Sequence, residues 1–159
     1  MIIAVDFDGT CVTHEFPKIG RDIGAIPVLR LLNEKGHKLI LNTMRSTRDA
    51  GNIDEHGNPL STNVLAEAVS WFKNNGIPLY GINRNPTQQQ WTSSPKVFAH
   101  LYIDDAALGC PLIYNPNISN NPFVNWESIV KHFYEIDIFN IEESNELITQ
   151  VRQVLKQYE

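Results

Sequence analysis

The feature that most constrains this chain is an apolar strand that runs directly into two aspartates. Residues 2–5 read Ile-Ile-Ala-Val, and Asp6-Phe7-Asp8-Gly9-Thr10 follows at once. Side chains two residues apart in a strand point to the same side, so we expect Asp6 and Asp8 to share a face while Phe7 packs inward. Two neighbouring carboxylates repel each other unless a cation or a proton lies between them. The segment therefore predicts a metal site that handles an anionic substrate.

Length and composition favour one globular domain that covers residues 1–159. Apolar residues make up 42% of the chain and charged residues 19%, which is ordinary for a globular protein. The net charge of −5 argues against a nucleic-acid partner, because non-specific binding needs a broad basic surface. No apolar run approaches ~18 residues, so we expect no membrane span.

The amino terminus and the cysteines favour a cytoplasmic protein. A signal peptide places basic residues before an apolar stretch, whereas this chain begins directly with an apolar strand. Cys11 and Cys110 lack the CxxC spacing of redox and metal motifs, and two thiols do not make a disulfide framework. We therefore expect both cysteines to be reduced thiols.

Strands alternate with helices along the chain. Strands are expected at residues 2–6, 38–42, 79–83, 99–103 and 111–114, and helices at roughly 22–35, from near Thr62 to Gly76, at 125–138 and at 141–157. Strands separated by helices favour parallel βαβ units, so the expected fold class is α/β, a three-layer sandwich around a mainly parallel, Rossmann-like sheet. The C-terminal helices, within residues 116–159, are expected to pack on this core.

Polar side chains stand where four of the predicted strands end. They are Asp6, Thr43, Asn83 and the pair Asp104-Asp105. Ligands of parallel α/β sheets bind beyond the carboxyl ends of the strands. We therefore expect these side chains to meet at one edge of the sheet and to form the functional site there.

The chemistry that this set of residues favours is phosphoryl transfer. A carboxylate that approaches a phosphate dianion is repelled by roughly 4 kcal/mol per charge pair at ~4 Å, so a cation and fixed positive charge are needed. Asp104 and Asp105 offer the hard oxygen ligands that suit Mg²⁺. Lys96 could place an ammonium beside the phosphate, and Thr43 could donate its hydroxyl and backbone N–H to a phosphoryl oxygen. Asp6 would attack and become phosphorylated, and Asp8 would transfer protons.

Four motifs in this order resemble the haloacid dehalogenase (HAD) superfamily of phosphatases and phosphotransferases. They are Asp6-Phe7-Asp8-Gly9-Thr10 after an apolar strand, Thr43 after Leu39–Asn42, Lys96 ahead of the fourth strand, and Asp104-Asp105 at the end of that strand. The resemblance covers residues 1 to about 115. It implies an HAD-like fold and a Mg²⁺-dependent phosphatase that acts on a phosphate monoester, most simply a small molecule.

The resemblance also implies a role for each matched residue. The catalytic residues would be Asp6 as nucleophile, Asp8 as general acid and base, Thr43 and Lys96. The Asp6 carboxylate and the Asp8 backbone carbonyl would hold the metal together with one of the paired aspartates, for which Asp105 is favoured. Asp104 would then either support the direct ligands or bind the metal through water. Because Asp8 is present, phosphoryl transfer is favoured over carbon–halogen hydrolysis.

The segments in which this superfamily carries cap domains are short in this chain. They are residues 9–21 and 84–95, so the chain resembles the small capless type, similar to uncharacterised bacterial and phage HAD-like hydrolases. Capless members have open sites, which act on large substrates or borrow a lid from another subunit. A homo-oligomer in which a neighbour covers the site is therefore one expectation.

Several alternatives stay open from the sequence. Arg45 and Arg48 are candidates for a phosphate or substrate contact or for plain surface charges, and Asn83 for a substrate contact or a turn residue. His14 is a candidate for a substrate contact or for orienting its loop, and otherwise for a solvated histidine. The chain could also be a binding or regulatory protein that kept the fold and lost useful turnover, or a phosphatase of a macromolecular phosphate.

Overall fold

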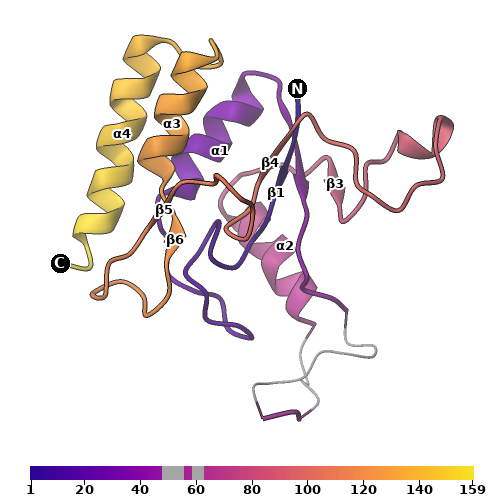
Figure 1. The fold of residues 1–159 in the computed structure, drawn as a ribbon, viewed down its shortest axis with the longest axis horizontal. Helices are drawn as coiled ribbons and strands as arrows, with labels where there is room; N and C mark the ends of the chain where they lie inside the picture. The colour runs from indigo at the N-terminus through magenta and orange to yellow at the C-terminus, as the bar shows by residue number, and fades with distance from the viewer. Residues whose placement is uncertain (48–55, 59–62) are drawn as a thin grey trace.

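The computed structural model describes residues 1–47, 56–58 and 63–159. Within them a four-stranded parallel sheet runs in the order β3-β2-β1-β4 (Figure 1). Its strands are β1 (Ile2–Val5), β2 (Lys38–Leu41), β3 (Gly81–Ile82) and β4 (Leu101–Ile103). In the register of the sheet, Ile3 of β1 lies between Leu39 and Leu101. The predicted α/β fold with a parallel, Rossmann-like sheet is therefore confirmed.

Three of the four helices in the described part of the chain begin after an asparagine that caps them. They are α1 (Ala25–Glu34), α2 (Val64–Asn74), α3 (Trp126–Glu135) and α4 (Ile141–Lys156). Asn63, Asn125 and Asn140 precede α2, α3 and α4, and the side chain of each accepts a backbone N–H three residues on. Pro27 is the third residue of α1, where its missing N–H costs nothing, so this helix starts just before its proline.

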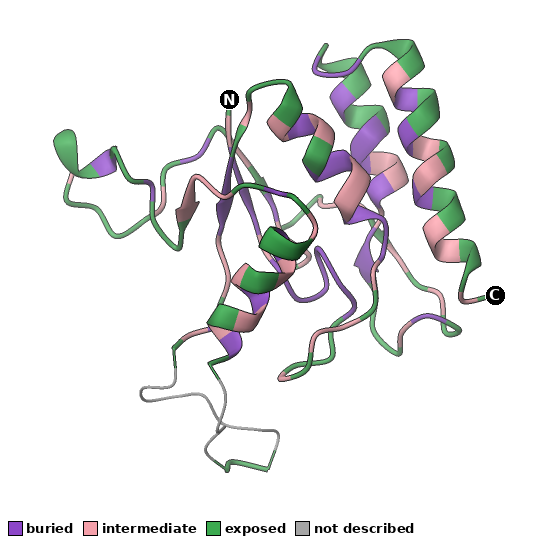
Figure 2. Ribbon diagram, turned by 180° about the vertical axis from the view of Figure 1, so that it is seen from behind, coloured by how far each residue is buried: buried purple, intermediate pink, exposed green. Residues whose placement is uncertain are grey.

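The helices of the described residues all lie on one side of the main sheet. Right-handed crossovers from β1 to β2 and from β2 to β3 place α1 and α2 on the same face. Consistent with this, Arg30 of α1 donates to the Asn75 carbonyl at the end of α2 at 2.6 Å, and Figure 2 shows α2 in front of the sheet with α1 beside it. Helices α3 and α4 pack against each other and against α1.

One hydrophobic cluster fills the space under these helices. It joins Ile3, Val5 and Leu39 of the sheet to buried side chains of all four helices, among them Leu29, Phe72, Phe133 and Leu147. The C-terminal helices thus share a core with the first strands, as expected from their apolar faces.

Among the described residues, no α-helix covers the opposite face of the sheet, so this part of the chain does not form the third layer of the predicted sandwich. The residues between β3 and β4, which are all described, contain only a short 3₁₀ helix, η1 (Gln88–Gln90). Tyr102, which is level with Ala4 on this face, donates its hydroxyl to the Val97 carbonyl and accepts the Ala99 N–H at 3.3 Å. Prolines at positions 86 and 95 interrupt this crossover, which explains why no longer helix forms there.

A second, two-stranded sheet follows the main one along the chain. The predicted fifth strand is present as β5 (Leu112–Ile113), but it pairs antiparallel with β6 (Phe123–Val124) instead of extending the parallel sheet. No sequence pattern predicted β6, because two residues are too few to show the alternation of a strand. Cys11 and Cys110 are both free. No helix in the described part of the chain is long and apolar enough to cross a membrane.

Candidate active site

The predicted acidic residues meet at the point where the strand order reverses. The chain moves from β1 outward to β2 and β3 and then returns to place β4 on the other side of β1, and crevices at such points are the usual ligand sites of α/β sheets. Asp6 follows β1, and Asp104-Asp105 follow β4. The three carboxylates each offer one oxygen within 4.8 Å of the others.

These carboxylates open into a cavity of about 410 Å³, which we call the acidic cavity. The described residues that line it are Asp6, Asp8, His14, Phe16, Thr43, Met44, Arg45, Asp104, Asp105 and Ala106. Four separated segments of the chain thus contribute to one site, and the predicted convergence of strand ends 1, 2 and 4 is what the structure shows.

Gly9 and Thr10 of the first motif position the carboxylates. Gly9 has a φ of 78°, and a Cβ there would lie 2.8 Å from the Asp105 carboxyl carbon, so both its conformation and the close approach require glycine. The buried Thr10 hydroxyl donates to Asp6 Oδ2 at 3.3 Å and accepts the Asp105 N–H at 3.1 Å. One side chain therefore ties the first acidic motif to the second.

The loop that carries Gly9 and Thr10 is held by residues that the sequence analysis did not single out. Val124 of β6 donates its N–H to the Gly9 carbonyl at 2.9 Å, and the buried Trp126 indole N–H donates to the Thr10 carbonyl at 2.7 Å. Trp126 is the first residue of α3, and its position in the sequence carries no signal of this role. The region after residue 115 thus supports the first motif directly.

Trp126→Phe is expected to lower the free energy of unfolding by about 1–3 kcal/mol, because the buried Thr10 carbonyl loses its indole donor. Urea unfolding followed by circular dichroism measures this change. Trp91→Phe is the matched control, since Trp91 is 62% exposed and should change stability by less than about 0.5 kcal/mol. Equal stability of the two variants would contradict the structural role of the Trp126 hydrogen bond.

Burial and mutual repulsion raise the pKa values of two residues in the acidic cluster, Asp6 and Asp105. Burial, together with the charges of Asp104, Asp105 and Asp8, raises the pKa of Asp6 from 3.8 to about 7, against the lowering effect of a backbone hydrogen bond. Burial and Asp104 also raise the pKa of Asp105, which the nearby His14 partly offsets. The cluster therefore resists carrying its full negative charge unless a cation or a proton lies among its carboxylates.

Asp8 does not join the acidic cluster but pairs with Arg45. Arg45 Nε donates to Asp8 Oδ2 and Arg45 Nη2 to Asp8 Oδ1, both at 2.7 Å. The two residues are 9% and 2% exposed, so this is a buried, two-pronged ion pair. Asp8 and Asp6 have separate environments although they are two residues apart in the chain.

The prediction that Arg45 binds substrate is not supported by this geometry. Its remaining N–H groups donate to the carbonyls of Pro17 at 3.1 Å, Lys18 at 2.7 Å and Val64 at 3.4 Å. With the two bonds to Asp8, all five guanidinium N–H groups are occupied by the protein. Arg45 instead joins the first motif, the loop before α1 and the start of α2.

Thr43 lies in the acidic cavity as predicted, but its backbone N–H is not available to a phosphate. That N–H donates to Asn83 Oδ1 at 2.8 Å, while the Thr43 Oγ1 accepts the Arg45 N–H at 3.2 Å. The hydroxyl keeps its own hydrogen for donation. Asn83 has a φ of 50° and does not line the acidic cavity among the described residues, so the structure favours its turn role over the predicted substrate contact.

Lys96, like Asn83, is a predicted site residue that does not line the acidic cavity in the structure. Its side chain is exposed, and it is absent from the described residues that line the acidic cavity. Its carbonyl accepts an N–H from the Gln88 amide at 2.7 Å. The same amide donates to the Ser94 carbonyl, and its oxygen accepts the Phe98 N–H, so Gln88 fixes the loop that carries Lys96.

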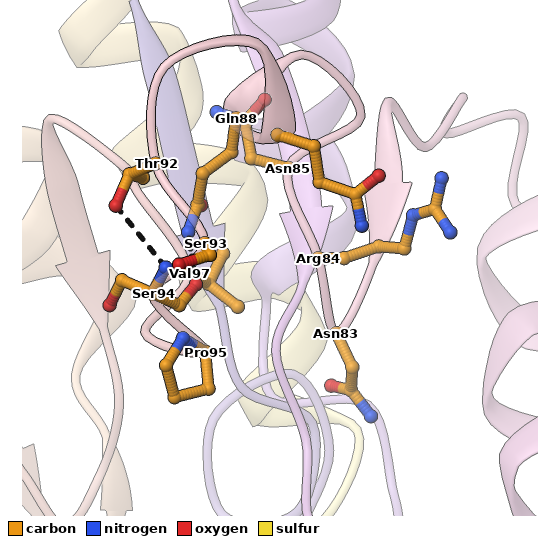
Figure 3. A pocket seen from close by; sticks show the side chains of 10 residues that line it. Asn83, Arg84, Asn85, Gln88, Thr92, Ser93, Ser94, Pro95 and Val97 are labelled. Atoms are coloured by element: carbon orange, nitrogen blue, oxygen red, sulfur yellow. Dashed lines mark hydrogen bonds between the residues drawn. The ribbon is translucent and has the colours of Figure 1, made fainter.

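That loop encloses a second, separate pocket of about 420 Å³ (Figure 3). Figure 3 shows the turn at 92–97 on one side of the pocket and Asn83 and Arg84 on the other. The described side chains that line it are amides, hydroxyls, one guanidinium and the apolar Pro95 and Val97, and none of them is a carboxylate. Of the other predicted residues, His14 lines the acidic cavity, and Arg48 falls outside the described residues.

Comparison with known proteins adds one relative of known structure. No family model matches the chain, and no curated protein matches it. Among solved structures it is similar to a conserved protein from Bacteroides thetaiotaomicron, with 30% sequence identity and a TM-score of 0.60. The match covers 90% of this chain and 95% of that one. The chain therefore belongs to the same family as this conserved Bacteroides protein.

Proposed function

We propose that the protein is a Mg²⁺-dependent phosphohydrolase that acts on a phosphate monoester through an aspartyl-phosphate at Asp6, as HAD-superfamily enzymes do. The observation that carries this proposal is the group of three carboxylate oxygens, from Asp6, Asp104 and Asp105, that lie within 4.8 Å of one another in the acidic cavity. Such hard oxygen donors fit Mg²⁺, which prefers carboxylates together with water and substrate phosphate.

Asp6 is the residue placed to attack. Its Oδ2 accepts the Thr10 hydroxyl, which fixes the rotation of the carboxylate and leaves Oδ1 for the phosphorus atom. Attack forms an oxygen–phosphorus bond at Asp6 and breaks the bond to the leaving oxygen, and water then hydrolyses the acyl phosphate. Bound Mg²⁺ supplies the positive charge that offsets the repulsion between Asp6 and the phosphate. The Thr43 hydroxyl is free to donate to a phosphoryl oxygen.

Proton transfer at Asp8 requires a rearrangement in this proposal. Both Asp8 oxygens accept N–H groups of Arg45 and Asp8 is only 9% exposed, so its carboxyl must become more accessible before Asp8 can exchange a proton with the leaving group or with water. Lys96 must likewise move with its loop to act beside the phosphate. Substrate binding that closes the site is the event that would bring both about.

The Asp8–Arg45 pair and the exposed Lys96 favour a second candidate, a phosphate-binding or regulatory protein with weak turnover. A binding protein needs the carboxylates and the cation but no free general acid. Beryllofluoride with Mg²⁺ separates the two, because it mimics a phosphate bonded to an aspartate. Protection of the fold by beryllofluoride without turnover of any phosphate ester supports the binding protein.

Removal of the metal is expected to abolish turnover. With Mg²⁺ the purified protein should hydrolyse p-nitrophenyl phosphate or members of a phosphometabolite panel. EDTA should stop the reaction, and excess Mg²⁺ should restore it. Asp105→Asn should raise the Mg²⁺ concentration for half-maximal rate by about 10-fold or more, because a charged ligand is lost.

Asp137→Asn is the matched control for this variant, since Asp137 is exposed and outside the acidic cavity, and its left-handed φ of 59° suits asparagine. This variant should keep the Mg²⁺ dependence of the parent. Hydrolysis at full rate in EDTA, or no hydrolysis of any ester with Mg²⁺, contradicts the proposed phosphatase.

A further inference from the structure

Two large apolar side chains line the acidic cavity beside its carboxylates. Phe16 comes from the loop before α1 and Met44 from the residues after β2, and both border the same cavity as Asp6. Met44 is 97% exposed and Phe16 36% exposed. Apolar groups left open in a cavity with a few convergent polar groups are the usual make-up of a small-molecule site.

The Phe16 ring packs against the Arg45 guanidinium in the absence of a ligand. The Arg45 guanidinium carbon lies 5.4 Å from the centre of this ring and 5.0 Å from that of Phe7. Arg45 also donates to the carbonyls of Pro17 and Lys18, the two residues that follow Phe16. A side chain ordered in this way loses little further freedom on binding, which favours affinity.

Met44 adds a flexible side chain beside the ordered Phe16 ring. Its side chain is unbranched and its sulfur makes favourable contacts with aromatic rings, so it can lie against a planar group of the ligand. Its neighbours Thr43 and Arg45 both line the cavity, which places Met44 next to the candidate phosphate site.

The Arg45 guanidinium, which lies against Phe16, has no N–H group left for a ligand. All five of its N–H groups donate to the protein itself. A polyhydroxyl group could therefore gain a hydrogen bond from Arg45 only by displacing one of these bonds, which is costly. An aromatic group needs no such donor.

We propose that Phe16 and Met44 form a subsite for an aromatic ring, so that the preferred substrates are phosphate monoesters whose leaving alcohol carries an aromatic ring. This inference rests on the proposed phosphatase activity and names its substrate class. The phosphate lies at Asp6 and the ring of the leaving alcohol lies between Phe16 and Met44.

Benzyl phosphate, ethyl phosphate and glucose 6-phosphate test this subsite with Mg²⁺ present. All three release primary alcohols, so their rates reflect recognition more than leaving-group chemistry. The value of kcat/KM for benzyl phosphate should exceed the other two by about 10-fold, the size expected of an aromatic contact with its buried area. Phe16→Ala should remove this preference, chiefly by raising KM for benzyl phosphate, and leave ethyl phosphate within about twofold of the parent.

Two further variants and a binding measurement make the result specific. Phe16→Tyr should keep the preference, and Phe98→Ala, which removes a comparably exposed phenylalanine outside the acidic cavity, should change nothing. Calorimetry with Mg²⁺ should show benzylphosphonate binding about 10-fold more tightly than ethylphosphonate, and Phe16→Ala should abolish that difference.

The possible failures are distinguishable. Equal kcat/KM for the three esters, or an unchanged preference in Phe16→Ala, overturns the aromatic subsite and leaves the phosphatase standing. No turnover of these esters or of acetyl phosphate overturns the proposed phosphatase, and the substrate class falls with it.

Discussion

Arg45→Met is expected to lower the free energy of unfolding by about 3–5 kcal/mol, the usual effect of removing one partner of a buried ion pair. The variant leaves the Asp8 carboxylate at 9% exposure without its two 2.7 Å hydrogen bonds. It also frees the carbonyls of Pro17, Lys18 and Val64 from their donor. Urea unfolding followed by circular dichroism measures the loss, which is large beside the total stability of a typical domain.

Two variants show whether the pair itself is responsible. Arg84→Met removes an exposed arginine and should change stability by less than about 0.5 kcal/mol. Adding Asp8→Asn to Arg45→Met removes the unpaired carboxylate, so the double variant should be more stable than Arg45→Met alone. A loss below about 1 kcal/mol in Arg45→Met would mean that Arg45 is not the buried link described above.

Asp6→Asn is expected to lower kcat by about 10³-fold or more, because an amide cannot form the covalent phosphoryl intermediate. Asparagine keeps the size of the side chain and an oxygen that can accept the Thr10 hydroxyl. The loss therefore reports chemistry and not packing. Steady-state rates on the best substrate of the panel, with saturating Mg²⁺, measure this loss of kcat. Activity near that of the parent would contradict the role of Asp6 as nucleophile.

The stability of Asp6→Asn provides the control. The Asp6 pKa is about 7 in the folded chain against an ordinary 3.8. Between these values the folded state holds a proton that the unfolded state has released, so stability falls as pH rises through this window. In EDTA at pH 8 the variant should be more stable than the parent by about 1–3 kcal/mol, allowing for partial exposure of Asp6, and near pH 3.5 the difference should shrink.

The strand ends of the candidate site were predictable because they depend on local pattern. An apolar run identifies a buried parallel strand, and the sheet then carries whatever follows each strand to one edge. This reasoning found Asp6, Thr43, Asp104 and Asp105, and the structure brings all four to the acidic cavity. The alternation of strands and helices along the chain also predicted the parallel α/β class. The asparagines before α2, α3 and α4 stand at the observed starts of those helices.

The roles of side chains that depend on partners far away in the sequence were not predictable from local patterns. Nothing near Arg45 in the sequence reveals that Asp8, 37 residues away, takes both prongs of its guanidinium. The Trp126 indole likewise reaches a carbonyl 116 residues away. Lys96 has the predicted order along the chain, but the fold of its own loop around Gln88 decides where its side chain points.

The order and polarity of neighbouring residues were enough to predict the parallel sheet and the acidic residues at the ends of its strands. They were not enough to predict that the described helices cover one face, that Arg45 pairs with Asp8 or that Asn83 accepts the Thr43 N–H. Buried polar groups must find hydrogen-bond partners, and these partners often come from distant parts of the chain. Which distant segments meet depends on the packing of the whole core, and a local sequence pattern does not contain that information.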